Sequence, residues 1–172
     1  LKVFGLEVRY KIMYKIGIID TINNKGIELL ESNNNFSYEI ITDLSRENLL
    51  TKLPKFDGVT LRRGKLDEEI LNKCKNLKVI ARHGVGYDNV DTAFLKRNNI
   101  TLLVTHNSTS TSPAEHVMFM ILNIYKGREM FHTMVRDGNF HKAIHLKIDD
   151  NFEVFNKTIL IAGFGRIGKK LI

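Results

Sequence analysis

The chain has 172 residues, of which 43% are hydrophobic and 26% charged, and its formal net charge is +7. This composition excludes a disordered chain, and no internal repeat indicates a solenoid. The basic residues are dispersed and not interleaved with aromatic ones, so we expect no nucleic-acid binding. No apolar run reaches the about 18 residues of a membrane span, so we expect no membrane association either.

In chain order, the pattern from Met13 onward alternates between strand and helix. Met13 directly precedes an apolar strand pattern, so we expect the native chain to begin there and residues 1–12 to be an upstream extension. Strands are predicted over 15–19, 38–42, 56–61, 77–81 and 100–105, and helices over 25–31, 45–53, 67–74 and 90–97. Five strands that alternate with four helices predict an α/β fold with a parallel sheet.

Cys74 is the only cysteine and lies in the predicted helix 67–74. A single cysteine can form neither an internal disulfide nor a thiolate metal site, which indicates a reducing compartment. Free cysteines are usually buried, so we expect a packing role and not a nucleophile. We therefore expect a cytoplasmic protein without a metal.

A domain boundary is predicted near 105–112, where the polar run 106–112 reads as a loop. Ser112, Pro113 and Glu115 form a capping-box pattern, in which the serine and the glutamate satisfy each other's backbone N–H groups. We therefore expect Glu115 to be structural and not catalytic. The following helix is predicted to end near Gly127, and its nearly continuous apolar surface predicts burial on most sides. Residues 129–156 are predicted to be a surface connection or a short helix.

A glycine-rich motif ends the chain. Residues 158–162 read as a buried strand that runs into the turn Gly163-Phe164-Gly165-Arg166-Ile167-Gly168. Gly163 permits a tight turn, Gly165 lets the backbone approach a pyrophosphate, and Gly168 permits close packing of helix against strand. The N–H groups of 164–167 would hold the anion at the start of a helix. This pattern predicts a dinucleotide-binding corner, with a glycine turn of no function as the alternative.

Two further clusters follow predicted strands, at the carboxyl edge where open α/β sheets bind ligands. The main-chain N–H groups of Gly84 and Gly86 are candidates for binding a carboxylate, with a capped turn into the next helix as the alternative. Arg62 and Arg63 follow the strand 56–61 and are candidates for pairing with a carboxylate or phosphate, with a solvated pair as the alternative.

Four motifs in order resemble the D-2-hydroxyacid dehydrogenases, with the phosphoglycerate dehydrogenases as the closest branch. They are Arg62, the run 82–91, the capping box with His116, and the terminal glycine turn. The resemblance covers about 14–172 and implies a flavodoxin-like, parallel-sheet substrate-binding domain over 13–105. It implies that 106–172 holds a joining helix and the start of a Rossmann NAD-binding domain.

The resemblance also implies the roles of site residues and NAD as the cofactor. Arg62 would approach the far end of the substrate, and the loop 84–86 would contact the substrate carboxylate and the nicotinamide side of the cofactor. The implied substrate-binding residues are Arg62, Gly84, Val85 and Gly86. The implied cofactor-binding residues are Val85, Gly163, Phe164, Gly165, Arg166, Ile167 and Gly168.

The function implied by the resemblance is hydride transfer between nicotinamide and C2 of a D-2-hydroxy acid. The predicted substrate is 3-phosphoglycerate, in serine biosynthesis, and a small 2-hydroxy or 2-keto acid is the expected partner. The alternatives are a glyoxylate or hydroxypyruvate reductase and a non-catalytic flavodoxin-like binding module. The family's catalytic arginine, glutamate and histidine, and the acidic residue that selects NAD, follow the glycine turn. We therefore expect an inactive N-terminal portion of an enzyme whose full-length form is a homo-oligomer.

Overall fold

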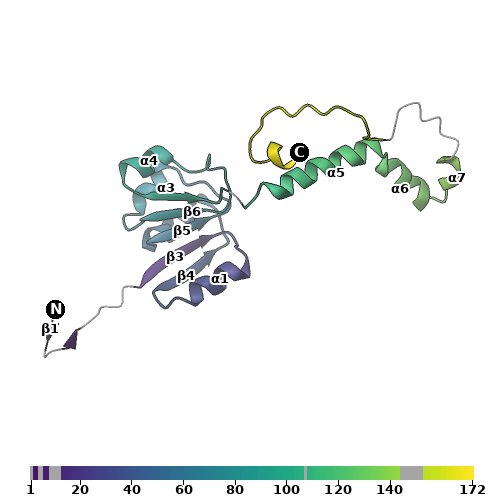
Figure 1. Cartoon of the computed structure of the whole chain (residues 1–172). Helices are drawn as coiled ribbons and strands as arrows, with labels where there is room; N and C mark the ends of the chain where they lie inside the picture. Colours follow the sequence, from purple (N-terminus) through teal and green to yellow (C-terminus); the bar gives the residue numbers. More distant parts are fainter. Residues whose placement is uncertain (1, 4–5, 8–12, 107, 144–152) are drawn as a thin grey trace. The chain divides into compact units, whose positions relative to one another are not determined.

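The computed structural model describes residues 2–3, 6–7, 13–106, 108–143 and 153–172 (Figure 1). It contains two compact units, Leu1–His106 and Asn107–Ile172. The chain starts with β1 (Lys2–Val3) and β2 (Leu6–Glu7), which pair antiparallel. The proposed upstream extension lies largely outside the described residues.

The first unit is built on a five-stranded parallel sheet in the order β4-β3-β5-β6-β7 (Figure 1). Its strands are β3 (Tyr14–Ile19), β4 (Phe36–Ile41), β5 (Gly58–Leu61), β6 (Val79–Arg82) and β7 (Thr101–Val104). The connecting helices are α1 (Asn24–Glu31), α2 (Arg46–Lys52), which continues into η1 (Leu53–Lys55), α3 (Glu68–Lys73) and α4 (Thr92–Arg97). The predicted α/β fold with a parallel sheet is confirmed.

Side-chain caps begin all four helices of this unit. Asn23, Ser45, Asp67 and Asp91 each accept a hydrogen bond from a backbone N–H of the first helical turn. Such caps satisfy donors that have no partner inside the helix. Local sequence therefore fixes where each helix starts, and consequently where each preceding loop leaves the sheet.

The core lies between the sheet and its helices, and its central strands carry apolar residues toward both faces. Ile18 and Ile19 on β3 are fully buried, as expected for a parallel strand covered on both sides. A Cβ at Gly17 would lie 2.8 Å from the Phe56 ring, so glycine at this position lets that ring pack against β3. Leu61, Leu66 and Ile80 are also fully buried and hold the ends of β5 and β6 in place.

Cys74 belongs to this core. Its exposed fraction is 4%, and its Sγ donates to the Ile70 carbonyl oxygen at 3.3 Å. Burial raises the pKa of the thiol to about 11. These observations support packing and argue against a nucleophilic role, because the thiolate is the reactive form.

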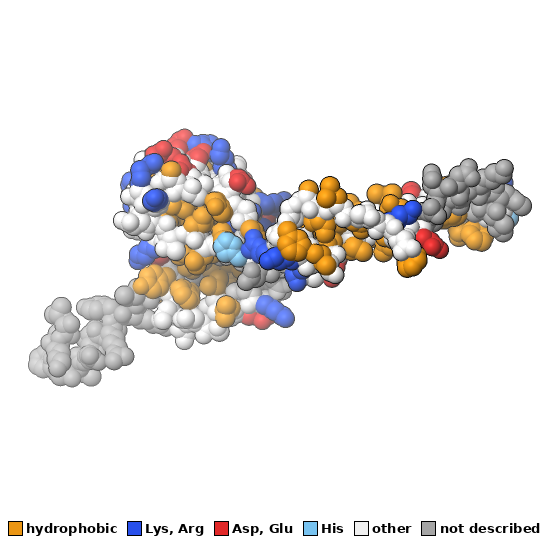
Figure 2. All heavy atoms as spheres, turned by 45° about the horizontal axis from the view of Figure 1, so that its top comes forward, with side chains coloured by type: hydrophobic (Ala, Val, Ile, Leu, Met, Phe, Trp, Pro, Cys, Tyr) orange, Lys and Arg blue, Asp and Glu red, His pale blue; other side chains and the backbone are white. Residues whose placement is uncertain are grey.

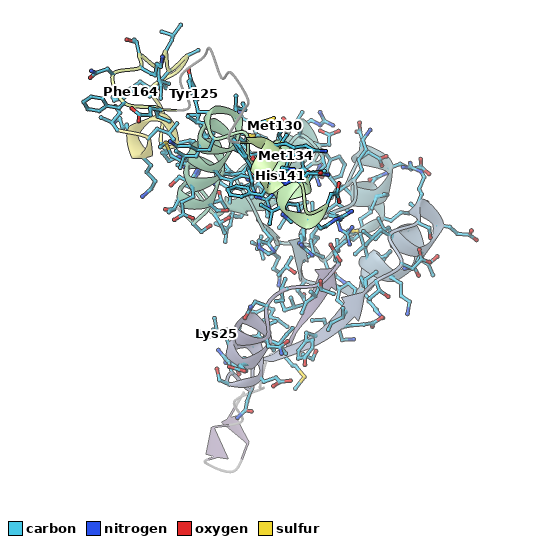
Figure 3. All side chains as sticks on the ribbon, turned by 90° about the vertical axis from the view of Figure 1, so that its right-hand side faces the viewer. Lys25, Tyr125, Met130, Met134, His141 and Phe164 are labelled. Atoms are coloured by element: carbon cyan, nitrogen blue, oxygen red, sulfur yellow. The ribbon has the colours of Figure 1, made fainter. Side chains whose placement is uncertain are left out.

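The second unit contains α5 (Thr111–Tyr125), α6 (Arg128–Arg136), α7 (Phe140–Ala143) and η2 (Gly168–Lys170). The predicted end of the first helix is confirmed, because Gly127 follows α5 in the left-handed conformation with φ +55°. The region predicted as a surface connection or a short helix contains α6, on which Met130 and Met134 lie four residues apart and share a side of the helix (Figure 3).

The predicted capping box is wrong. The N-cap of α5 is Ser110, which makes no side-chain capping bond, and the helix begins at Thr111. Pro113 then occupies the third helical position. The helix tolerates it there because the first-turn N–H groups have no intrahelical acceptor. Proline chemistry alone therefore does not distinguish the first helical position from the third.

The predicted burial of α5 is also not what the structure shows. Its exposed large apolar side chains are Met118, Phe119, Met120, Leu122 and Ile124, and we call this set the apolar face of α5. Orange side chains run along this helix in Figure 2. Of the side chains on α5, the structure buries Ala114 only. The apolar pattern of α5 predicts packing partners, but the described part of the second unit covers only part of the surface of this helix.

The strand predicted over 158–162 is absent from the structure of this segment. Residues 158–161 have no regular secondary structure, and Leu160 is 91% exposed. A strand needs a neighbouring strand to satisfy its backbone groups. No other strand occurs in the described residues of this unit. The apolar run 158–162 therefore has strand propensity but forms no strand, because no neighbouring strand is present in the described part of this unit.

Within the described ranges, no helix is long and apolar enough to cross a membrane. The same residues contain no group of three or more histidine, cysteine, aspartate or glutamate side chains placed to hold a metal ion.

Candidate functional site

The carboxyl ends of four strands bring the candidate site residues of the first unit to one edge of the sheet. Ile19 pairs with Leu61, Leu61 with Arg82, and Arg82 with Val104. The residues that follow these four positions therefore leave the sheet side by side. We define the carboxyl-edge cluster as Asp20, Arg62, Arg63, the loop 84–86 and Thr105. This edge is where open parallel sheets bind ligands.

The loop 84–86 is fixed by two hydrogen bonds to the end of β7. Gly84 N–H donates to Thr105 Oγ1 at 3.0 Å, and Thr105 N–H donates to the Gly84 carbonyl at 3.1 Å. Gly84 has φ +138°, a conformation that side chains rarely adopt. Its role is therefore to shape the loop. Its N–H is paired with Thr105 in this structure, and a contact of this N–H with a substrate carboxylate stays a prediction.

Val85 and Gly86 remain candidates for binding the carboxylate. Within the described chain, neither of their N–H groups has a hydrogen-bond partner. Gly86 is exposed and Val85 is half-buried, so both donors lie at the surface of this edge. Two adjacent unpaired N–H groups are suited to bind one carboxylate.

Arg82 lies directly behind this loop, a contact that the sequence motif did not reveal. Its Nη1 donates to the Leu61 carbonyl at 3.2 Å and also to the His83 carbonyl. A Cβ at Gly84 would lie 3.1 Å from the same Nη1. The guanidinium therefore joins the ends of β5 and β6 and places positive charge behind the loop 84–86.

The loop after β5 is joined to the loop after β6. Leu66 N–H donates to the Asn89 carbonyl at 2.8 Å, and Asp91 N–H donates to the Leu66 carbonyl at 3.0 Å, which forms an isolated parallel bridge between Leu66 and Val90. The Asn89 side-chain amide also donates to the Gly64 carbonyl at 2.6 Å. The arginines and the glycine loop are thus held in one framework.

Asp20 is the site residue that sequence reasoning missed. It follows β3 with φ +70°, is 6% exposed, and accepts hydrogen bonds from Arg63 Nε at 2.6 Å and Arg63 Nη2 at 3.1 Å. Arg62 Nη1 lies farther away, 3.6 Å from Asp20 Oδ2 and 3.4 Å from Thr21 Oγ1. These hydrogen bonds, mainly from Arg63, lower the pKa of Asp20 to about 2. The sequence feature that could have identified Asp20 is its position, because it is an acidic residue directly after a buried strand.

The glycine turn of the second unit is formed without its predicted strand. Gly163 has φ +103°, and a Cβ at Gly168 would lie 2.6 Å from the Gly163 carbonyl oxygen. A Cβ at Gly165 would meet nothing within 4 Å, so the backbone there is open to a ligand. Lys169 N–H donates to the Gly165 carbonyl at 2.9 Å, and the short helix η2 stands where the start of a helix was predicted. The predicted contact of this turn with a pyrophosphate stays a prediction.

Phe164 and Arg166 flank this open position. Phe164, which is labelled in Figure 3, is 60% exposed. Lys169 Nζ lies 5.9 Å from the centre of its ring. The second unit therefore presents glycine backbone beside basic side chains, an arrangement suited to an anion. The structure thus gathers Arg62 and the loop 84–86 in the first unit, and residues 163–168 in one turn of the second.

An open parallel sheet with ligand-type loops at its carboxyl edge, followed in sequence by a glycine-rich turn, is typical of the α/β proteins that include dinucleotide-dependent dehydrogenases. Residues 16–160 match the family of the D-isomer specific 2-hydroxyacid dehydrogenase catalytic domain, and the chain belongs to this family.

Named relatives agree with this assignment. The chain is 28% identical over 155 residues to a D-3-phosphoglycerate dehydrogenase from Archaeoglobus fulgidus, covering 90% of this chain and 28% of that protein. It is 30% identical over 164 residues to a glyoxylate reductase from Pyrococcus furiosus, covering 91% and 48%. Among solved structures, an NAD-dependent formate dehydrogenase from Staphylococcus aureus, in complex with NAD, is similar with a TM-score of 0.75 and 25% identity, covering 91% and 51%. The chain thus spans about half or less of these relatives.

Proposed function

We propose that this chain supplies the substrate-binding part of an NAD-dependent oxidoreductase that transfers a hydride between nicotinamide and C2 of a D-2-hydroxy acid. The observation that supports it best is the pair of unpaired N–H groups of Val85 and Gly86. They lie at the edge of the sheet that also carries Arg62. A carboxylate bound there would leave C2 of the substrate next to the loop and its remaining chain free to extend toward the arginine.

We propose 3-phosphoglycerate as the substrate. Its carboxylate would accept from Val85 and Gly86, and its phosphate would pair with Arg62, whose guanidinium is suited to phosphate oxygens. The Archaeoglobus fulgidus relative is named for this substrate. Glyoxylate is the alternative, since the Pyrococcus furiosus relative is a glyoxylate reductase. Glyoxylate has no distal anionic group, so it would use the loop without Arg62.

We propose NAD as the cofactor, with its pyrophosphate on the turn 163–168. Gly165 offers open backbone and Gly163 the required left-handed conformation. When bound, the nicotinamide supplies the position that accepts or delivers the hydride. The residues that would move the proton in this family come after the glycine turn, so we expect the 172-residue chain by itself not to reduce keto acids.

The test is a titration of the isotope-labelled 172-residue chain with glycolate, followed through its backbone amide resonances. We expect the resonances of Val85 and Gly86 to shift with glycolate and to remain in place with ethylene glycol, which has the same carbon skeleton but no carboxylate. Equal responses to the two compounds, or no response, would contradict the substrate-binding role.

A second titration separates an enzyme from a non-catalytic binding module. That alternative has one observation in its favour, because the first unit has its own core whereas the strand predicted at 158–162 is not formed. We expect NADH to shift the amide resonances of Gly163 and Gly165. A chain that binds glycolate but gives no response to NADH would support the binding module.

A further inference from the structure

Asp20 sits between two arginines but bonds to them unequally. Arg63 gives it two hydrogen bonds, at 2.6 and 3.1 Å, whereas the nearest guanidinium nitrogen of Arg62 is 3.6 Å away. The Asp20 side chain is 8% exposed, whereas those of Arg62 and Arg63 are 48% and 70% exposed. The two arginines are adjacent in sequence and both reach solvent, yet Arg63 is held by the carboxylate through two hydrogen bonds, whereas Arg62 Nη1 donates to Thr21 Oγ1 at 3.4 Å.

A buried carboxylate requires a partner, because removing its charge from water without compensation is costly. Asp20 is fixed in place by the backbone. Its N–H donates to the Ile41 carbonyl at 2.9 Å, and Arg62 N–H donates to the Ile19 carbonyl at 3.3 Å. Since the carboxylate is largely buried at this point, one of the two neighbouring guanidinium groups must neutralise it. Arg63 neutralises it through Nε and Nη2, which bind the two carboxylate oxygens, and this bidentate geometry is the one in which arginine pairs most strongly.

We propose that Arg63 is a positioning residue whose pairing with Asp20 keeps Arg62 available to bind the anionic group of the substrate that lies farthest from C2. This inference rests on the proposed function. It extends the predicted role of Arg62 by assigning its two neighbours a role in specificity, and it applies to a phosphate or a carboxylate in the distal position.

Removal of Arg63 has a consequence that distinguishes this role from direct contact. In Arg63→Gln, the buried Asp20 would lack its main partner, and Arg62 would have to move only from 3.6 Å into hydrogen-bond distance to replace it. Arg62 would then be lost to the ligand. In Asp20→Asn/Arg63→Gln no carboxylate competes for Arg62, so its binding of the distal anion should return.

The experiment measures the dissociation constants of D-3-phosphoglycerate and D-glycerate from the amide resonances of the labelled 172-residue chain. The ratio of the two constants isolates the contribution of the phosphate. We expect Arg62→Gln and Arg63→Gln each to lower the preference for the phosphorylated ligand about tenfold, which corresponds to about 1.4 kcal/mol. We expect Asp20→Asn/Arg63→Gln to recover the preference to within about threefold of the parent chain. A difference of that size is well below the roughly tenfold loss expected for each single variant.

The matched control is Arg97→Gln, which removes an exposed arginine from a pair with Glu68 Oε1 at 3.0 Å on other elements of the unit. It should leave the ratio unchanged. Preserved resonances of the core strands establish that each variant is folded. If Arg62→Gln or Arg63→Gln does not fold, Arg62→Lys or Arg63→Lys respectively replaces it.

A double variant as impaired as Arg63→Gln would overturn the proposal, because it would show that Arg63 contacts the ligand directly. Unchanged preference in Arg63→Gln would also overturn it. Failure of the proposed function gives a different result, in which neither D-3-phosphoglycerate nor D-glycerate shifts Val85 and Gly86 in the parent chain. Binding of D-glycerate without any preference for the phosphorylated compound overturns this inference alone.

Discussion

Replacing Gly84 with alanine should destabilise the first unit, whereas the same change two residues later should not. The φ of Gly84 is +138°, and an added Cβ would lie 3.1 Å from Arg82 Nη1. Gly86 is not in a left-handed conformation, and its added Cβ would meet Asp88 Oδ2 at an ordinary 3.6 Å. The two glycines belong to the same loop, so the second is a matched control for the first.

The expected magnitude follows from two contributions. A side chain in a backbone region reserved for glycine costs about 1–3 kcal/mol. Displacing Arg82 weakens its hydrogen bond to the Leu61 carbonyl, and hydrogen bonds to charged groups contribute about 1.5–3 kcal/mol when lost in full. Because the arginine can move and keep part of that bond, we expect Gly84→Ala to cost about 2–3 kcal/mol in total. Gly86→Ala should stay within about 0.5 kcal/mol of the parent chain.

The assay is urea unfolding followed through the amide resonances of Leu61 and Ile80, which report on the first unit alone. With a urea dependence of about 2 kcal/mol/M, the midpoint of Gly84→Ala should fall by about 1 M. Glycolate binding at Val85 should weaken in the same variant, because the loop conformation that exposes its N–H depends on Gly84. Equal midpoints for the two alanine variants would refute the reasoning.

Three further outcomes are expected. The pKa of Asp20 is lowered from 3.8 to about 2, so its pairing stabilises the fold above pH 4 and this stabilisation is lost as pH falls toward 2. The acid unfolding curves of the parent chain and of Asp20→Asn should therefore converge at low pH. The pKa of Cys74 is raised from 9.0 to about 11, so stability should decline as pH rises through this interval, and a disulfide reagent should label the thiol only after urea is added. Labelling of the native chain at neutral pH would contradict its burial. Gly168→Ala should open the glycine turn, because its Cβ would lie 2.6 Å from the Gly163 carbonyl oxygen, whereas Gly165→Ala should leave the turn intact, a difference visible in the Lys169 amide resonance.

The first unit was predictable because each of its elements contains its own local signals. Apolar runs of strand length alternate with helices that start at Asn23, Ser45, Asp67 and Asp91, and the observed ends lie within two residues of the predicted ones. The positions of Arg62 and the loop 84–86 followed from the sheet, since parallel strands place the following loops at one edge.

The second unit was predicted less well, because its apolar segments depend on partners that the pattern does not specify. Leu160 is exposed although its sequence favours a strand, and the apolar face of α5 is exposed although its sequence predicts burial. The hydrogen-bond partners of the site residues could not be predicted from the sequence either. The occupation of Gly84 N–H by Thr105, and of Asp20 by Arg63, depends on residues brought together only by folding.

The bridge between Leu66 and Val90 limits how ligand preference can change in this unit. It pairs backbone with backbone at both loops, and Leu66 is fully buried beneath them. An inserted or deleted residue between Arg62 and Leu66 would shift this pairing and move the arginines away from the loop 84–86. A change in preference for the distal group is therefore far more accessible by exchanging side chains at positions 62, 63 and 65 than by changing the length of the segment. Libraries that aim to alter ligand choice should vary those three positions at constant chain length and keep Gly64, whose φ is +98°.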